Sequence, residues 1–189
     1  MEKIPAQQTS DCVKIVLFGP ESTGKTTLAK DLAATFNTQW VPEYMREYLE
    51  KKWSDTKEKC TKEDLVPIAI GQMNAENEAT RKVNQVLFCD TNLLEIKVYS
   101  EYYYDGYCPP EIKNAALDNI YHFYFLTYID TPWVFDNLRD RPDDRSELFC
   151  IFEAELKRLG VPYFTLKGSH SERLHSAIHQ IRKLLKQKT

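Results

Sequence analysis

The chain has 189 residues, of which 42% are hydrophobic and 28% charged, with a formal net charge of −3 and a pI near 5.9. This is an ordinary soluble composition, and the length suits one domain, residues 1–189, rather than two. The mildly acidic balance argues against nucleic acid as a partner. No apolar run approaches the roughly 18 residues of a membrane span, which argues against a membrane.

Five scattered cysteines without a C-x-x-C pair indicate reduced thiols, and the polar start of the chain lacks the apolar centre of a secretion signal. We therefore expect a cytoplasmic protein whose residues 1–11 form a short flexible lead-in. The sequence leaves the oligomeric state open, a homo-oligomer included.

The first expected strand, Val13–Phe18, runs into the P-loop pattern G-x-x-x-x-G-K-T over residues 19–26, and a helix-forming segment follows. The glycines let backbone amides turn toward phosphate oxygens, and the helix N-terminus adds the positive end of its dipole. Lys25 is expected to reach the β- and γ-phosphates, and the Thr26 hydroxyl to bind Mg²⁺. The pattern predicts a nucleotide phosphate site.

Downstream, apolar periodicity and turn residues predict short strands that alternate with helices. In chain order we expect a helix over 26–36, a strand over 38–41, a helix over 43–53, a charged linker over 54–61 and a helix over 64–84 capped by Asp64. Next come a strand over 86–90, helices over 91–104 and 111–119, and a strand over 121–127. The chain closes with a helical turn opening at Thr131, an arginine-rich loop, a helix over 146–159 ended by Gly160, a strand over 162–166 and a helix capped by Ser169 and Glu172. Five short apolar strands among helices predict a three-layer α/β/α fold with a mainly parallel sheet.

Two acids follow expected strands. Asp90 ends the strand 86–90 and would hold a metal-bound water or accept the proton of the substrate hydroxyl. Glu43 follows the second strand, at the sheet end where open α/β folds bind ligands, and would take that proton or grip a ribose. Arg46, one turn on, would pair with Glu43 or reach a phosphate. Which of the two acids is the base stays open.

Arg139, Arg141 and Arg145 alternate with aspartates in a loop without an apolar anchor. As a lid over 136–146, this loop would close on the phosphates, exclude water and spread the charge of the transition state. We expect Arg139 or Arg145 to touch phosphate.

Aromatic residues offer less direct indications. Trp133 follows a Thr-Pro pair and could stack on a flat ring or lie half in the core. We expect the run Tyr102-Tyr103-Tyr104 to pack within its helix rather than to support a base.

The motifs and their order are Gly19-Pro-Glu-Ser-Thr-Gly-Lys-Thr-Thr-Leu28, Glu43-Tyr-x-Arg-x-Tyr48, Ile70-Gly71-Gln72, Cys89-Asp-Thr-Asn92, and Thr131-Pro-Trp-Val134 with Asp136-x-Leu-Arg139. Over residues 14–185 this order resembles the ribosylnicotinamide kinase domain of NadR-type proteins, of the AAA_28-like P-loop NTPases. The resemblance implies an adenylate-kinase-like sheet and an enzyme that uses ATP and Mg²⁺ to phosphorylate the 5′-hydroxyl of nicotinamide riboside.

The resemblance also implies roles for individual residues. Lys25, Glu43, Asp90 and Arg139 would be catalytic, and Thr26 and Asp90 would hold Mg²⁺. The ATP phosphates would be held by Gly19, Glu21, Ser22, Thr23, Gly24, Lys25, Thr26, Thr27 and Arg145. The nucleoside substrate would be held by Glu43, Tyr44, Arg46, Gln72, Asn92 and Trp133.

Two positions depart from the resemblance. Pro42 stands where bifunctional members carry a tryptophan that stacks on the pyridine ring, and residues 74–75 are Asn-Ala where a second stacking tyrosine is expected. Because the ring of nicotinamide riboside is cationic, aromatic faces are good partners for it. Tyr44, Trp133 and the tyrosine run are the candidates to replace the two stacking residues.

Two other functions fit the same motifs. One is a kinase for another nucleoside or small hydroxyl substrate. The other is a non-catalytic module that senses ATP and reports on NAD metabolism. A GTPase is disfavoured because the guanine signature N-K-x-D does not occur in the sequence.

Overall fold

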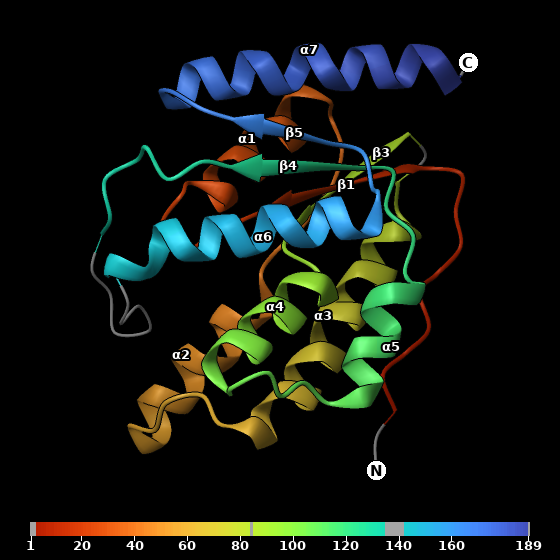
Figure 1. Cartoon of the computed structure of the whole chain (residues 1–189). Coiled ribbons are helices and arrows are strands. Elements are labelled where there is room, and N and C mark those ends of the chain that lie inside the picture. The colour runs from red at the N-terminus through yellow and green to blue at the C-terminus, as the bar shows by residue number, and fades with distance from the viewer. Residues whose placement is uncertain (1–2, 84, 135–141, 189) are drawn as a thin grey trace.

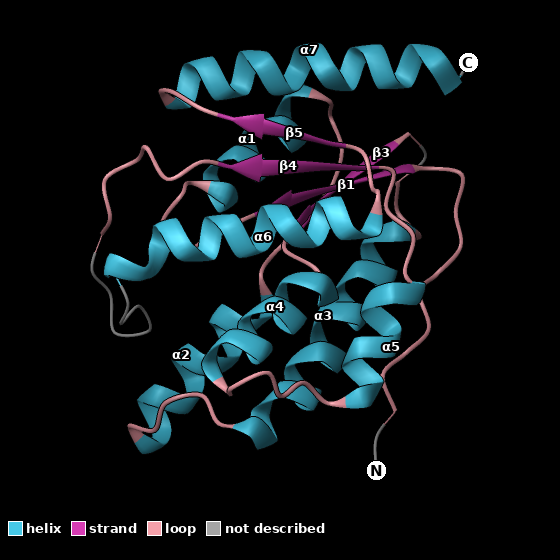
Figure 2. Ribbon diagram, viewed as in Figure 1, coloured by secondary structure: helices cyan, strands magenta, loops and turns pink. Residues whose placement is uncertain are grey.

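The computed structural model describes residues 3–83, 85–134 and 142–188, and within them the chain forms a five-stranded sheet between two layers of helices (Figures 1 and 2). The strands are β1 (Val13–Phe18), β2 (Trp40–Val41), β3 (Val86–Asp90), β4 (Phe123–Thr127) and β5 (Tyr163–Leu166). They lie in the order β2-β3-β1-β4-β5, and every pairing is parallel. The expected three-layer α/β/α fold is confirmed.

The described helices cover both faces of the sheet. They are α1 (Lys25–Thr35), α2 (Tyr44–Thr56), α3 (Leu65–Thr80), α4 (Leu93–Tyr103), α5 (Pro110–Asp118), α6 (Arg145–Leu159) and α7 (His170–Lys188). Helices α1 and α7 pack on one face, while α3, α4 and α6 lie on the other, with α2 and α5 against α3 and α4 (Figure 1).

The central strand β1 explains why the sheet is covered twice. Its alternate side chains enter different cores, with Ile15 and Leu17 facing α1 and α7, and Val16 and Phe18 facing the other helices. All six residues of β1 are buried. A strand buried on both faces needs a continuous apolar run, and Val13–Phe18 is such a run apart from Lys14.

Two local predictions were wrong, and a third was right in position but not in its contacts. The strand expected over 38–41 shrinks to β2, because Thr38 uses its hydroxyl to bond the carbonyl of Val86, 2.6 Å away. Asp64 is the N-cap residue of α3 as expected, but its side chain makes no capping hydrogen bond to that helix. Its carboxylate instead accepts from the amide and hydroxyl of Thr61, as the second half of a capping box on the short 3-10 turn over 62–64. The helical turn expected at Thr131 does not form, since residues 131–134 have no regular structure and bond to the P-loop.

The described part of the lead-in, residues 3–11, bonds to side chains of α3. The Gln7 amide donates to the Glu76 carboxylate at 2.8 Å, and the Gln8 amide N–H donates to the side chain of Asn77 at 2.6 Å. Glu76 is buried and also pairs with Lys14, whose ammonium group donates to the carbonyl of Gln8. Polar groups in the interior need such partners, so this segment completes a buried network.

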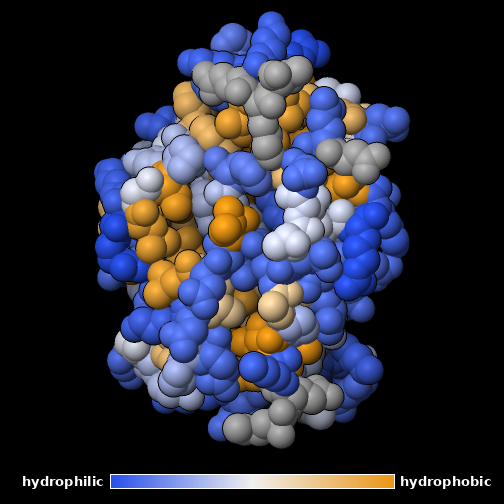
Figure 3. Space-filling model, turned by 90° about the vertical axis from the view of Figure 1, so that its right-hand side faces the viewer, coloured by the Kyte–Doolittle hydropathy of each residue, from blue (hydrophilic) through white to orange (hydrophobic). Residues whose placement is uncertain are grey.

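Figure 3 views the molecule from the side of the strands' amino ends, where apolar side chains form separate patches between charged ones. The large apolar side chains that the structure exposes include Ile120, at 71%, and Val134, at 60%. Of the helices described, none has the length and apolar character that a membrane crossing requires.

Candidate active site

The loop between β1 and α1 has the shape that its glycines allow. Gly19 has φ of 134°, and a Cβ there would lie 2.8 Å from the hydroxyl oxygen of Thr127, so β4 leaves room for no side chain. Gly24 caps α1 in the left-handed region with φ of 83°. Thr23 closes the loop on itself by donating to the carbonyl of Pro20 at 2.8 Å. The backbone therefore wraps a concave site at the N-terminus of α1, which suits an anion.

Lys25 is held inside this loop. Its ammonium group donates to the carbonyl oxygens of Gly19, at 2.6 Å, and Pro20, at 2.9 Å. It also forms an ion pair of 3.2 Å with Glu95, a residue of α4 that is only 2% exposed. The sequence prediction named Lys25 but not this carboxylate partner.

Thr26 and Asp90 come together as expected. The Thr26 hydroxyl donates to Oδ2 of Asp90 at 2.5 Å, because β3 lies beside β1 and ends level with the first turn of α1. The other oxygen, Oδ1, is buried and has no partner among the described residues. A hydroxyl and a carboxylate oxygen are the hard ligands that Mg²⁺ takes, so the pair fits the metal that the P-loop implies. The described residues contain no cluster of three His, Cys, Asp or Glu side chains suited to another metal site.

Three acids, Glu43, Asp90 and Glu95, act electrostatically on the buried Lys25. The pKa of Glu95 is raised to about 8, mainly by burial, with the charge of Lys25 opposing the shift and those of Glu43 and Asp90 adding to it. Burial also raises the pKa of Asp90 to about 6, again helped by Glu43. Burial alone would lower the pKa of Lys25, but Glu95, Glu43 and Asp90 together outweigh it and the net shift is upward. The site therefore carries more negative charge than Lys25 can neutralise, which favours binding of a further cation.

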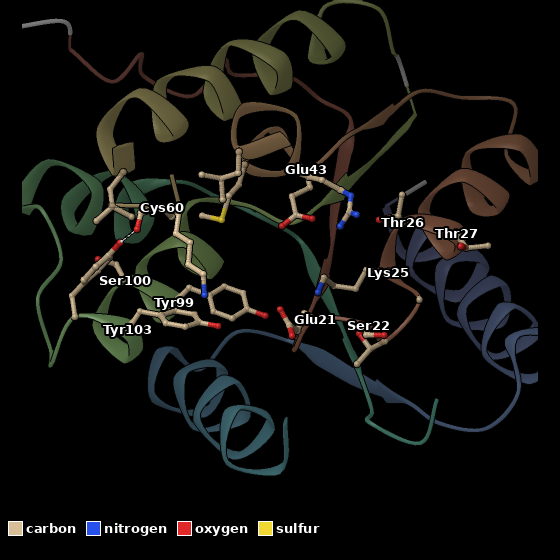
Figure 4. A pocket seen from close by; sticks show the side chains of 18 residues that line it. Glu21, Ser22, Lys25, Thr26, Thr27, Glu43, Cys60, Tyr99, Ser100 and Tyr103 are labelled. Atoms are coloured by element: carbon tan, nitrogen blue, oxygen red, sulfur yellow. Dashed lines mark hydrogen bonds between the residues drawn. The ribbon is translucent and has the colours of Figure 1, made fainter. Parts of the chain in front are cut away.

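A cleft of about 560 Å³ opens beside the P-loop (Figure 4). One end is formed by P-loop residues 21–27, and the other is largely apolar. Its remaining walls come from α2 and its N-cap, from the segment before α3, and from α4. They are lined by Glu43, Met45, Arg46, Leu49, Lys59, Cys60, Leu65, Tyr99, Ser100, Tyr103 and Tyr104.

On the α2 side, the structure places the predicted residues in two groups. Glu43 is the N-cap of α2 and lines the cleft with Arg46, whose Nε pairs with Glu50 at 3.0 Å. Tyr44 is not among the described residues that line the cleft. Its ring covers Gly71 so closely that a Cβ there would lie 2.0 Å from it.

Gln72 and Asn92 were expected to bind substrate, and both are instead buried and bonded to the chain. The Gln72 side chain accepts from the amide of Tyr44 at 2.8 Å and donates to the carbonyl of Pro42 at 3.3 Å, so it positions the turn that carries Glu43. Asn92 caps α4 by accepting from the amide of Glu95 and donates to the Tyr124 hydroxyl. The physical reason is that backbone N–H and C=O groups at strand and helix ends lack partners within their own element, and the side-chain amides of Gln72 and Asn92 supply them.

Trp133 and Arg145 support the P-loop from outside the cleft. The indole N–H of Trp133 donates to Glu21 at 3.3 Å, and the guanidinium of Arg145 donates to the carbonyls of Thr131, at 3.0 Å, and Ser22, at 3.3 Å. Arg145 therefore braces the loop backbone, where a phosphate contact was expected. Arg139 and most of the lid expected over 136–146 lie outside the described residues.

The tyrosine run packs within its helix as expected, since the Tyr103 ring meets the rings of Tyr99 and Tyr102. In addition, Tyr103 and Tyr104 line the cleft together with Tyr99. Residues four apart share a helix face, so Tyr99 and Tyr103 lie on the same face of α4 as Glu95. Once Glu95 is known to pair with Lys25, this spacing predicts that both tyrosines face the cleft.

Arg173 of α7 is a further residue that sequence reasoning missed. Its buried guanidinium donates to the carbonyls of Thr23, at 2.7 Å, and Tyr128, at 2.9 Å, and it also pairs with Asp130. It thereby joins the P-loop to the loop after β4. No local motif indicates this role, since these three partners lie 43 to 150 residues away in sequence.

Comparison with known proteins agrees with this geometry. The family model described as AAA domain matches residues 14–173. The trifunctional NAD biosynthesis/regulator proteins NadR of Salmonella typhimurium and Escherichia coli K12 are each 32% identical over 141 residues, which cover 73% of this chain and 34% of the relative. The chain thus spans about a third of the length of these curated relatives.

Solved structures share the fold. A NadR protein in complex with NR has a TM-score of 0.75 at 21% identity, with 92% of this chain and 51% of that chain covered. Deoxyadenosine kinase from M. mycoides with bound dATP has a TM-score of 0.58 at 15% identity, with 90% of this chain and 99% of that chain covered.

Proposed function

The chain belongs to the P-loop family whose model is described as AAA domain, and we propose that it transfers the γ-phosphate of ATP to the 5′-hydroxyl of nicotinamide riboside, giving nicotinamide mononucleotide. The observation that carries this proposal is that one cleft joins the P-loop to Glu43 and to the apolar end between α2 and α4. A donor phosphate and an acceptor hydroxyl would meet inside it. The name of the curated relatives, which refers to NAD biosynthesis, and the NR bound in a structural relative support this choice of acceptor.

The P-loop residues bind and orient the donor. The backbone amides of the loop and the N-terminus of α1 face the phosphates, and a phosphate would draw the Lys25 ammonium group from the carbonyls of Gly19 and Pro20. Thr26 and Asp90 would hold Mg²⁺, which when bound neutralises charge on the β- and γ-phosphates.

Glu43 is the proposed base. It lines the cleft at the N-terminus of α2, where it is half-buried, whereas Asp90 already accepts the Thr26 hydroxyl through Oδ2. A carboxylate within reach of the 5′-hydroxyl would accept its proton as the oxygen attacks the γ-phosphorus. Arg46, on the same wall, adds positive charge close to the transferred group.

We further propose ATP and Mg²⁺ as cofactors, a small-molecule nucleoside as the binding partner, and the cytoplasm as the location. The five cysteines are all free thiols in the structure, in keeping with a reducing compartment.

The experiment is ADP release from Mg²⁺–ATP across a panel of acceptors that holds nicotinamide riboside, the common ribo- and deoxyribonucleosides, and no acceptor, with Lys25→Ala as the blank. We expect strong and selective stimulation by nicotinamide riboside. Stimulation by another nucleoside alone would keep the reaction and refute the substrate. ATP binding without stimulation by any acceptor would refute the enzyme and favour an ATP-sensing module.

Glu43→Gln tests the base in the same assay. It removes the proton acceptor but keeps the size of the side chain, so we expect turnover to fall by about 10²- to 10⁴-fold with little change in ATP affinity. Unchanged turnover would remove Glu43 from the mechanism.

A further inference from the structure

One face of α4 follows the whole length of the cleft. Glu95 pairs with Lys25 at the phosphate end, and Tyr99 and Tyr103 follow at intervals of four residues, which places them on the same helix face. Four residues of a helix rise about 6 Å along its axis. Tyr99 therefore lies about one such rise beyond Glu95, and Tyr103 about two. The face therefore runs from the site of phosphoryl transfer toward the apolar end of the cleft.

The two tyrosine rings form a continuous wall. Their centroids are 6.0 Å apart and their planes differ by 29°. Behind them, Phe152 of α6 meets Tyr99 edge to face at 5.3 Å. Figure 4 shows both rings reaching from α4 into the cleft with their hydroxyl ends toward Glu21 and Lys25.

The Tyr99 hydroxyl is buried and has no hydrogen-bond partner among the described residues. A buried hydroxyl without a partner costs free energy, and hydroxyls in native proteins are normally satisfied. Burial, with the charges of Glu95, Glu21 and Glu43 added, raises the pKa of Tyr99 well above its usual value, so the group remains a hydrogen-bond donor. A ligand oxygen in the middle of the cleft would give this donor its acceptor.

We propose that Tyr99 and Tyr103 form the wall that binds the acceptor nucleoside, with the Tyr99 hydroxyl donating to a ribose oxygen and the Tyr103 ring facing the cationic pyridine ring. This inference rests on the proposed function and deepens it. The 5′-hydroxyl must lie at the Lys25 end, so the ribose comes next, beside Tyr99, and the base farthest out, beside Tyr103. The opposite wall, with Met45, Leu49 and Leu65, is apolar and closes on the other side of a flat ring.

The test uses Tyr99→Phe and Tyr103→Leu in the full chain, with Tyr102→Leu as the matched control. Tyr102 directly precedes Tyr103 in the same helix but is not among the described residues that line the cleft. Its hydroxyl lies 3.4 Å from the Glu147 carboxylate. Calorimetry with a non-hydrolysable ATP analogue present gives the Kd of nicotinamide riboside and of its reduced form, whose ring carries no charge. ATP affinity and the unfolding midpoint of each variant report on correct folding.

Tyr103→Leu should raise the Kd of nicotinamide riboside by about 2- to 30-fold and that of the reduced riboside by much less, because only the charged ring gains from the aromatic face. Tyr99→Phe should raise the Kd of both ribosides alike, by about 2- to 10-fold, since both keep the ribose. The control should bind both as the wild type does.

Other outcomes overturn the inference in distinguishable ways. Wild-type affinity in both tyrosine variants would refute the wall while leaving the kinase proposal intact. Equal losses for charged and reduced ribosides in Tyr103→Leu would refute the contact with the cationic ring. A wild-type protein that binds ATP but no nicotinamide riboside would refute both proposals together.

Discussion

The strongest test of the site's electrostatics is Glu95→Gln. Glu95 lies 2% exposed against Lys25, and burial raises the pKa of its carboxyl from an ordinary 4.5 to about 8. The folded state therefore holds a proton on Glu95 over a pH range in which the unfolded chain has lost it. Below about pH 4.5, Glu95 therefore does not lower the free energy of unfolding. As the pH rises above that value, its unfavourable contribution grows, and it is complete above about pH 8.

The magnitude follows from the same shift. Each pKa unit corresponds to about 1.4 kcal/mol, so a shift from 4.5 to about 8 costs about 5 kcal/mol above pH 8 and about 3 kcal/mol at pH 7. Glutamine has the shape of the protonated acid and cannot ionise. The variant should therefore be more stable than the wild type by about 3 kcal/mol at pH 7, with little difference at pH 4.5.

Urea unfolding of both proteins at pH 4.5, 7 and 8.5 measures this difference directly. Glu111→Gln, at an exposed position in the first turn of α5, controls for the loss of one charge. A stability difference that does not change with pH, or a variant less stable than the wild type at pH 8.5, would refute the reasoning.

Three further substitutions test the packing around the site. Gly71→Ala places a Cβ 2.0 Å from the Tyr44 ring. The overpacking cost of about 1–3 kcal/mol should exceed the gain of about 1 kcal/mol in helix propensity. We therefore expect urea unfolding to give a lower free energy of unfolding for the variant. Lys14→Met leaves the Glu76 carboxylate buried without its cation and should cost about 3–5 kcal/mol in urea unfolding. Arg173→Ala removes the donor that joins the P-loop to the loop after β4, so both the thermal midpoint and the affinity for ATP should fall.

Each of the three has a control within the chain. Tyr44→Ala should relieve most of the cost of Gly71→Ala in the double variant, because the clash is with that ring. Lys82→Met breaks an exposed pair with Glu78 and should cost at most about 1 kcal/mol. Arg158→Ala removes an exposed arginine far from the P-loop in the fold and should leave ATP affinity unchanged. Losses of equal size in a variant and its control would contradict the explanation given for that pair.

Local patterns in the sequence were sufficient for the fold and for the position of the P-loop. The run Val13–Phe18, the pattern at residues 19–26 and the acid at Asp90 each depend on neighbours within a few residues, so their structure could be predicted before any long-range contact was known. Helix ends behaved likewise where the cap is local, as at Gly160, with φ of 64°, and at Ser169 with Glu172. The capping box between Thr61 and Asp64 was missed because Asp64 was considered only as the N-cap of α3, a position that it does occupy.

The sequence by itself determined that a P-loop follows a buried strand and that Asp90 ends another one, because strand, loop and helix propensities act over short stretches of chain. Only the tertiary structure decided which side chains share the cleft. Tyr99 and Tyr103 reach it because α4 packs with one face turned toward Lys25, which pairs with Glu95 of that helix. Gln72 and Asn92 leave it because buried backbone groups at Tyr44 and Glu95 need their amides. Such choices depend on which distant polar groups the fold buries together, and a buried polar group must find its partner wherever the chain brings one.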